Sequence, residues 1–148
     1  MTAHGESSFV FSHIGLCIYD LERSIRFYRE VFGFIEAEVY DSGSEVDRLL
    51  GLRNVRERAQ WMRHPNGLII ELQYYYSPTA VGSRNIRPQN QLGVTHLAFY
   101  VNDIDLFVAR VSKCEGTVLD NRTTIGDVNI QSCADPDGVR ISLMQVIR

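Results

Sequence analysis

The sequence predicts an α+β fold made of two similar modules, each with the element order β-α-β-β-β, that together form a curled mixed sheet. The first observation is an internal repeat: a block that begins at His13 aligns without a gap on a block that begins at His96, and the two blocks end at Gly33 and Gly116. The second is a Pro-x-Gly turn before an apolar run later in each half. A repeat of this length indicates one supersecondary unit that occurs twice.

The first half contains the signals of one complete module. Residues 9–19 are rich in aromatic and β-branched residues that alternate with small or polar ones, which predicts a strand. Asp20 is a helix N-cap, the helix runs to about Phe32, and Gly33 ends it. Three more strands are expected at residues 34–40, 58–63 and 68–74, the last two joined by the turn at 64–67.

The second half repeats this order. Residues 94–102 predict a strand, Asp103 caps a helix to about Cys114, and Gly116 stops that helix. The remaining strands are expected at 117–121, 128–133 and 139–147, with a turn at 135–138. The first half carries extra residues around 41–57 that have no counterpart in the second.

The domain organisation follows from the repeat. We expect a single domain over residues 1–148, with module 1 at 9–76 and module 2 at 92–148. Residues 77–91 contain two prolines and a glycine and show no periodicity, so they are expected to form the linker.

Composition excludes several classes of function. The chain has 148 residues, a net charge of -3 and no basic run, which argues against a nucleic-acid partner. No apolar stretch is long enough to cross a membrane, and the first residues do not have the pattern of a secretion signal. Three cysteines without a C-x-x-C spacing indicate reduced thiols, and we therefore expect a cytoplasmic protein. A chain of this size needs no structural metal, so a bound metal would be functional.

Each module opens with a strand that bears a His ahead of an Asp-capped helix, and closes with a strand after a PDG-type turn. This arrangement resembles the vicinal oxygen chelate superfamily over residues 9–146. That superfamily includes glyoxalase I, methylmalonyl-CoA epimerase, extradiol dioxygenases, fosfomycin-resistance enzymes and bleomycin-binding proteins. The resemblance implies a glyoxalase-like fold with a metal-binding cleft, whose ligands come from the first and last strands of both modules.

Transferred residue by residue, the resemblance implies a site for a divalent metal ion (Fe, Mn, Ni or Zn) held by His13, Glu71 and His96. Glu71 is also the candidate catalytic base, a role that it could serve if it leaves the metal. The fourth position departs from the pattern. Ser142 stands where glyoxalase I and many epimerases have a Glu that is both ligand and base. This chain therefore lacks the fourth ligand of those enzymes.

The alternation of residues along the strands is a second, independent reason to expect the two histidines and Glu71 to lie close together. His13 shares a strand face with Gly15 and Cys17, and the more apolar opposite face is expected beneath the helix. Two imidazoles and one carboxylate can hold a divalent ion and leave positions open for two substrate oxygens. Taken singly, each residue could instead be an ordinary interior residue, and Glu71 could pair with an arginine.

Five further residues are candidates for substrate contact. Arg140 shares a face of the last strand with Ser142 and could hold a substrate carboxylate or phosphate, or could pair with a local acidic residue. Trp61 and Tyr100 could form aromatic walls for a planar molecule, although strand-end tyrosines also pack against linkers. Gln131 could bond to substrate, or could be an ordinary polar residue of an exposed sheet face.

Three functions remain open for a protein that acts on a small molecule. The first is a metal-dependent lyase or isomerase of the glyoxalase or epimerase type. The second is an Fe(II)-dependent ring-cleaving dioxygenase, for which two His and one carboxylate suffice. The third is a metal-free protein that sequesters a ligand, as in bleomycin resistance. We also expect a homodimer, because small curled sheets expose edges and members of the resembled superfamily usually pair.

Overall fold

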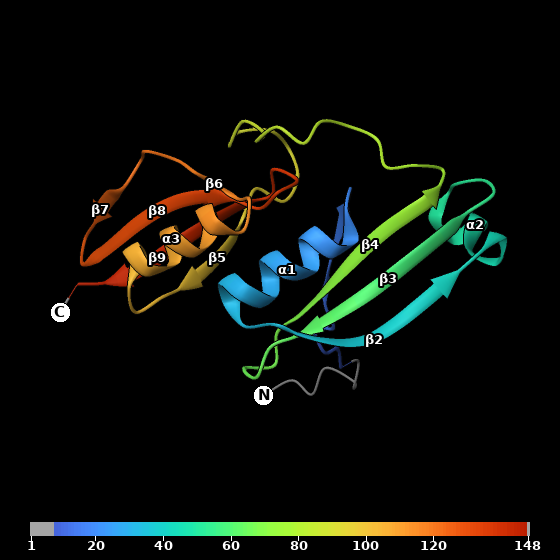
Figure 1. Cartoon of the computed structure of the whole chain (residues 1–148), viewed down its shortest axis with the longest axis horizontal. Helices are drawn as coiled ribbons and strands as arrows, with labels where there is room; N and C mark the ends of the chain where they lie inside the picture. Colours follow the sequence, from blue (N-terminus) through green and yellow to red (C-terminus); the bar gives the residue numbers. More distant parts are fainter. Residues whose placement is uncertain (1–7, 148) are drawn as a thin grey trace, which may run out of the picture.

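The computed structural model describes residues 8–147 and contains two mixed sheets that lie side by side, as the sequence predicts (Figure 1). The ends of the predicted domain, residues 1–7 and 148, lie outside the described residues. The first sheet has the order β1-β4-β3-β2, with β1 at Ile14–Ile18, β2 at Ile35–Ser42, β3 at Arg56–Arg63 and β4 at Ile69–Ser77. The second has the order β5-β9-β8-β6, with β5 at Leu97–Tyr100, β6 at Thr117–Val118, β8 at Val128–Ala134 and β9 at Arg140–Val146.

The strand pairing confirms the repeat. In each sheet the first strand of the module pairs in parallel with the last one, β1 with β4 and β5 with β9, and the other pairs are antiparallel. A parallel pair needs a crossover connection, and each module supplies one that includes its long helix. The equivalent histidines therefore precede equivalent edge strands.

The two long helices, α1 (Leu21–Phe32) and α3 (Ile104–Lys113), begin where the sequence predicts. The side chain of Asp20 accepts from the backbone N–H of Arg23, and Asp103 does the same for Leu106, both at 3.0 Å. Gly33 ends α1 in the left-handed region, with φ of 78°.

Gly116 lies just after α3, where the sequence predicts that the helix stops, but it does not take the left-handed conformation that Gly33 takes after α1. Glu115 takes that conformation instead, with φ of 64°. A Cβ on Gly116 would lie 2.6 Å from Val111 Cγ1 and 2.7 Å from Phe27 Cε2, so the position is restricted by close packing. Gly116 therefore allows the end of α3 to approach α1.

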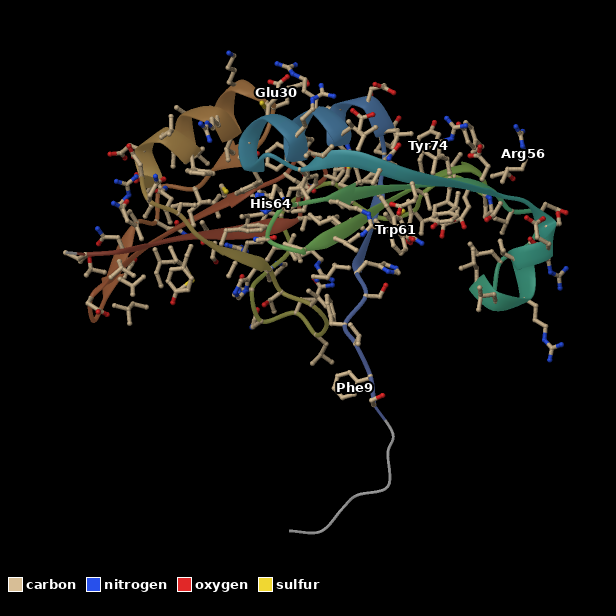
Figure 2. All side chains as sticks on the ribbon, turned by 90° about the horizontal axis from the view of Figure 1, so that it is seen from below. Phe9, Glu30, Arg56, Trp61, His64 and Tyr74 are labelled. Atoms are coloured by element: carbon tan, nitrogen blue, oxygen red, sulfur yellow. The ribbon has the colours of Figure 1, made fainter. Side chains whose placement is uncertain are left out.

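Both long helices cover the same side of the paired sheets, and Figure 2 shows them together above the strands. The core between helices and sheets is continuous across the modules, and Phe32 of α1 stacks on Phe99 of β5 with ring centroids 4.4 Å apart. The other face of each sheet, which carries no long helix, is called the open face below. The short helix α2 (Asp47–Leu50) lies on this other side, at the far end of the first sheet.

Several elements differ from the prediction. β1 begins at Ile14, and residues 9–13 are not part of a strand. The extra residues of module 1 form a 3-10 turn, Ser44–Val46, before α2. An additional short strand, β7 (Thr123–Ile125), pairs with β8. Residues 78–96, which include most of the predicted linker, contain neither helix nor strand. Among residues 8–147, no helix has the length and apolar character to span a membrane.

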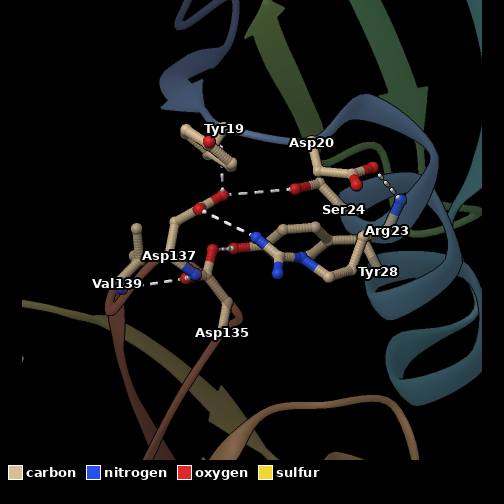
Figure 3. Close-up of polar contacts among 8 residues, drawn as sticks. All are labelled: Tyr19, Asp20, Arg23, Ser24, Tyr28, Asp135, Asp137 and Val139. Carbon is tan, nitrogen blue, oxygen red and sulfur yellow. Dashed lines mark hydrogen bonds and ion pairs between the residues drawn. The ribbon is translucent and has the colours of Figure 1, made fainter. Parts of the chain in front are cut away.

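The turn between β8 and β9 docks on the first turn of α1 and joins the two modules (Figure 3). The carboxylate of Asp137 accepts from the backbone N–H of Tyr19 at 3.3 Å and from the hydroxyl of Ser24 at 3.4 Å. It also pairs with Arg23 at 3.4 Å. A carboxylate at this end of a helix is stabilised by the helix dipole. Asp137 thus supplements the local cap Asp20 with a charge from the other module.

Asp135 forms the buried half of the same contact. Tyr28 donates its hydroxyl to Asp135 Oδ2 at 2.8 Å, while the backbone N–H groups of Asp137 and Val139 donate to Oδ1 at 2.9 Å. Asp135 is only 2% exposed. Burial raises the pKa of its carboxyl to about 6, although the three hydrogen bonds oppose that shift.

This pKa predicts a pH-dependent stability that Asp135→Asn should remove. Because the folded pKa is raised, the contribution of Asp135 is fully present below its unfolded pKa and is lost as pH rises through about 6. The amide can accept both backbone N–H groups and donate to Tyr28, so it keeps the contacts without the charge. We expect the variant to gain roughly 2 kcal/mol relative to wild type between pH 4.5 and pH 8.

Urea unfolding at several pH values measures this difference. Parallel pH profiles for wild type and Asp135→Asn would contradict the prediction, because all other titrating groups are common to both proteins.

Candidate metal and substrate site

The open face of the first sheet brings His13, Glu71 and Trp61 together. Gly15 of β1 and Trp61 of β3 both lie opposite Glu71 of β4 in the strand register. His13 Nε2 lies 3.6 Å from Glu71 Oε2, and the Trp61 indole N–H donates to the same oxygen at 2.6 Å. The rings of His13 and Trp61 lie 4.8 Å apart. This part of the predicted site is therefore assembled within one module.

Gly15 makes room for this arrangement, which the sequence analysis did not identify. A Cβ at Gly15 would lie 3.3 Å from Gln73 Oε1 and 3.8 Å from Glu71 Oε1. The side chains of Gln73 and Glu71 therefore extend over the backbone of β1. A larger residue at this position would displace them from the edge of the sheet.

The two histidines have equivalent neighbours. His13 Nδ1 lies 2.8 Å from the hydroxyl of Ser12, and His96 Nδ1 lies 2.8 Å from the hydroxyl of Thr95. A ring that donates Nδ1–H to such a hydroxyl keeps the lone pair of Nε2 for another partner, and metal-binding histidines are commonly oriented in this way. The Ser12-His13 and Thr95-His96 pairs align in the internal repeat and could have been noticed there.

His96 does not join the other two ligands within one chain. Among residues 8–147, no three His, Cys, Asp or Glu side chains gather into a cluster able to hold a metal ion. His96 Nδ1 instead lies 2.8 Å from the hydroxyl of Thr95 and 3.1 Å from the amide Nε2 of Gln89. Because an amide N–H can only donate, Nδ1 accepts in this arrangement and Nε2 carries the proton, so the Gln89 amide would have to turn for His96 Nε2 to bind a metal. Of the three predicted ligands, His13 and Glu71 therefore lie close together in one chain, and His96 lies apart from them, just before the edge strand β5 of the second sheet.

The His13–Glu71 pair nevertheless fits a divalent ion. Two ligand atoms that each lie roughly 2.0–2.2 Å from one ion are separated by roughly 3–4 Å, which is the spacing of His13 Nε2 and Glu71 Oε2. An imidazole nitrogen and a carboxylate suit Zn, Fe, Mn or Ni. The chain therefore places two candidate ligands, His13 and Glu71, at a spacing that a divalent ion could bridge.

The predicted substrate residues of the second sheet divide between its two faces. Ser142 lies opposite Ala98 and Ser132, on the open face with Arg140. Tyr100, two residues after Ala98 on β5, is 71% exposed on that face. These three side chains therefore share the open face of the second sheet.

Gln131 differs from the prediction. It lies opposite Leu143 and is buried on the helix-covered face. Its Oε1 accepts from Arg122 Nε at 2.8 Å, and its amide donates to the carbonyl of Leu119. Both ends of the side chain are occupied by structural contacts, so we do not include Gln131 in the substrate site.

Glu57 was not singled out from the sequence, yet it is a buried acidic residue at the far end of the same face. It is 8% exposed, and its Oε2 has no hydrogen-bond partner among the described residues. Burial, followed by the charge of Glu57 and a hydrogen bond to it, raises the pKa of Tyr75 to about 12. Burial also raises the pKa of Cys17, with contributions from Asp137 and Glu57. The Cys17 thiol is therefore protonated near neutral pH, which argues against a nucleophilic role.

The contact between Trp61 and Glu71 predicts a specific effect of Trp61→Phe. The variant keeps an aromatic ring beside His13 but loses the N–H that holds Glu71 Oε2. Removal of a group that orients a ligand commonly weakens metal binding by about 10–100-fold. We expect a loss in this range, measured by competition with a chromogenic chelator.

Tyr40 provides the matched control, because its ring contacts Trp61 at 5.6 Å from the other side. Tyr40→Phe keeps that packing and should bind metal like wild type. Equal metal affinity of Trp61→Phe and wild type would show that the indole N–H does not support the carboxylate as a ligand.

The chain matches known proteins over nearly its whole length. A glyoxalase family protein from Bacillus cereus superposes with a TM-score of 0.87 at 21% identity, covering 99% of this chain and 100% of that one. A glyoxylase/bleomycin resistance protein/dioxygenase domain from Frankia gives a TM-score of 0.68 at 20% identity, covering 95% and 99%. The trypanothione-dependent glyoxalase I of Leishmania major gives a TM-score of 0.67 at 24% identity, covering 93% and 87%.

At these identities the structures establish a shared fold. Among curated proteins, none matches the chain in sequence. The family itself is defined by a sequence profile that matches residues 10–143. The chain therefore belongs to the Glyoxalase/Bleomycin resistance protein/Dioxygenase superfamily.

Proposed function

We propose that the protein is a metal-dependent lyase or isomerase of the glyoxalase or epimerase type, acting on a small substrate with vicinal oxygens. The observation that carries this proposal is the His13–Glu71 pair on an open sheet face, 3.6 Å apart and supported by Ser12 and Trp61. The same His-hydroxyl pair recurs at His96. An ordinary ion pair on the surface would not account for that recurrence.

The proposed metal ligands are His13, Glu71 and His96, with Fe, Mn, Ni or Zn as the ion. A bound divalent ion would polarise a substrate carbonyl and stabilise charge on its oxygen. Glu71 is the proposed base. Trp61 restrains its Oε2, while Oε1 extends toward Gly15 and is available to accept a proton from the carbon beside the carbonyl and to return it.

We propose that a second copy of the chain completes the site. The open faces of both sheets lie on the side away from the long helices (Figure 2), so a twofold partner could set its second sheet against the first sheet of this chain. His96 and Ser142 of the second copy would then face His13 and Glu71. The two histidines have similar neighbours but lie apart within one chain. In a dimer of this kind they could still bind the same ion.

One observation favours a second candidate, an Fe(II)-dependent ring-cleaving dioxygenase. Ser142 supplies no carboxylate at the fourth ligand position, and an oxygenase needs open positions for substrate and oxygen. A metal-free protein that sequesters a ligand is the remaining alternative, and it predicts that no divalent ion binds tightly.

Mixing two inactive variants tests the metal site and its assembly together. His13→Ala and His96→Ala should each lose tight metal binding, by at least 100-fold, in the homogeneous protein. In a mixed dimer, a site shared between chains would pair the intact His13 of one copy with the intact His96 of the other. About half of the sites in each mixed dimer should then regain metal affinity and activity.

To obtain the mixed dimer, the two variants carry different tags, are refolded together, and the mixed species is purified. Sedimentation would show whether a dimer forms, and metal titration would count the sites. If the mixed species recovers neither metal affinity nor activity, the site is not shared between two chains. If both single variants still bind metal tightly, the proposed metal site is wrong.

Ser142→Glu separates the two reaction classes. In a lyase or isomerase the new carboxylate should tighten metal binding by at least tenfold and preserve turnover. In an oxygenase it should occupy an open position and suppress oxygen uptake by the Fe(II)-loaded protein. Ser142→Ala is the control, and it should change neither metal affinity nor turnover by more than about threefold, because a serine hydroxyl is a weak ligand.

A further inference from the structure

A cavity of about 370 Å³ lies between the modules, at the edge of the first sheet. Its walls come from Gly15 and Cys17 of β1, from the residues just before β5, from the start of β9 and from the linker. This volume lies within the range of about 300–1,000 Å³ that is typical of small-molecule sites. The charged side chains that line it are those of Arg87, Arg140 and Asp137, and His96 lines it as well.

The two arginines of this cavity pair with no Asp or Glu among residues 8–147. Arg140 Nη2 donates to the carbonyl of Arg87 at 3.3 Å, and Arg87 Nη2 donates to the carbonyl of Val94. A guanidinium has five N–H donors, so most donors of each side chain remain available. The cavity therefore presents two cationic groups whose charge is not balanced by a paired carboxylate.

The one carboxylate that lines the cavity is already engaged. Asp137 pairs with Arg23 and accepts from Ser24 and from the backbone of Tyr19. Those partners all belong to the first turn of α1 or to the residue before its cap. Asp137 therefore does not neutralise Arg87 or Arg140, and the cavity favours an anion.

The walls are held in place by close backbone packing. Gly138 has φ of 83°, and a Cβ there would lie 2.9 Å from the carbonyl oxygen of Asn85 and closer still to that of Arg84. The linker backbone thus lies directly on the turn before β9. Arg140 begins β9 and Arg87 lies two residues after Asn85 in the linker, so this packing, together with the bond from Arg140 to the Arg87 carbonyl, holds both arginines at the cavity before any ligand arrives.

We propose that this cavity is an oxyanion site, in which Arg87 and Arg140 together bind a carboxylate or phosphate group. Paired guanidinium donors suit the planar or tetrahedral oxygens of these groups. His96 lines the same cavity and is a proposed metal ligand. We assign the anion to the substrate, which makes the substrate an organic acid or a phosphate ester, and this assignment rests on the proposed function.

The binding of the anion itself can be tested without metal. Chelator-treated protein is titrated with inorganic phosphate in one arm and acetate in the other, at constant ionic strength. Nitrogen-15 NMR follows the side-chain Nε–H signals of the arginines and the backbone signals near Gly138. We expect saturable shifts at Arg87 and Arg140, and the anion that binds more tightly identifies the chemical group of the ligand.

Arg87→Gln and Arg140→Gln should each weaken anion binding by at least tenfold. Arg140→Lys keeps the charge without the planar fork and should fall between wild type and Arg140→Gln. Arg84→Gln is the matched control: Arg84 belongs to the same linker but stacks on Tyr19 at 4.7 Å. This control should bind within threefold of wild type.

Three results would overturn the proposal: no saturable shift with either anion, an equal loss in Arg84→Gln and Arg87→Gln, or retained binding in both cavity variants. An equal loss of anion binding in Arg84→Gln and Arg87→Gln would indicate that the anion responds to the overall positive charge of this region and not to Arg87 itself. His13→Ala keeps this test independent of the proposed function, because that variant should lose metal and retain the anion. Anion binding without metal binding in wild type would support the cavity and contradict the enzyme.

Discussion

The docking of the β8–β9 turn on α1 is the contact on which the rest of the structure depends. The carboxylates of Asp135 and Asp137 in module 2 contact two hydroxyls, a guanidinium and a backbone N–H of module 1. Hydrogen bonds that involve charged groups are stronger and more directional than apolar contacts. They therefore fix the relative position of two modules whose shared core, made of aliphatic and aromatic side chains, would tolerate some sliding.

This docking also determines which surfaces remain available for function. The turn that bears Asp137 continues through Gly138 into Arg140, so the residues that join the modules also position one wall of the cavity between them. Both long helices lie on the same side (Figure 2), while Glu71, Arg140 and Ser142 lie on the opposite faces of the sheets. Residues along β1 alternate between the two faces of the sheet. Its apolar residues enter the core, while Gly15 and the preceding His13 face the other way.

The signals that were readable from the sequence are local or repeated. The caps Asp20 and Asp103 act within one turn of helix, and the repeat aligns His13 with His96, so fold class and candidate ligands could both be predicted. The features that the sequence did not show depend on contacts between distant segments. The face on which Gln131 lies follows from the register of β8 against β9, and the role of Gly116 follows from its approach to Phe27. No local pattern shows that Asp137 would meet Arg23.

The distribution of charged side chains limits where an anion can bind in the proposed site. The chain is acidic overall, with a net charge of -3, yet Arg87 and Arg140 at the module junction have no acidic partner among residues 8–147. Glu57 lies buried on the open face of the first sheet, and its Oε2 has no hydrogen-bond partner within the described part of the chain. Its charge contributes to the raised pKa of Cys17, which lines the cavity at the junction. In the proposed oxyanion site an anionic group would therefore be attracted by the two arginines and repelled from the Cys17 side of the cavity, so Glu57 would restrict where that group binds.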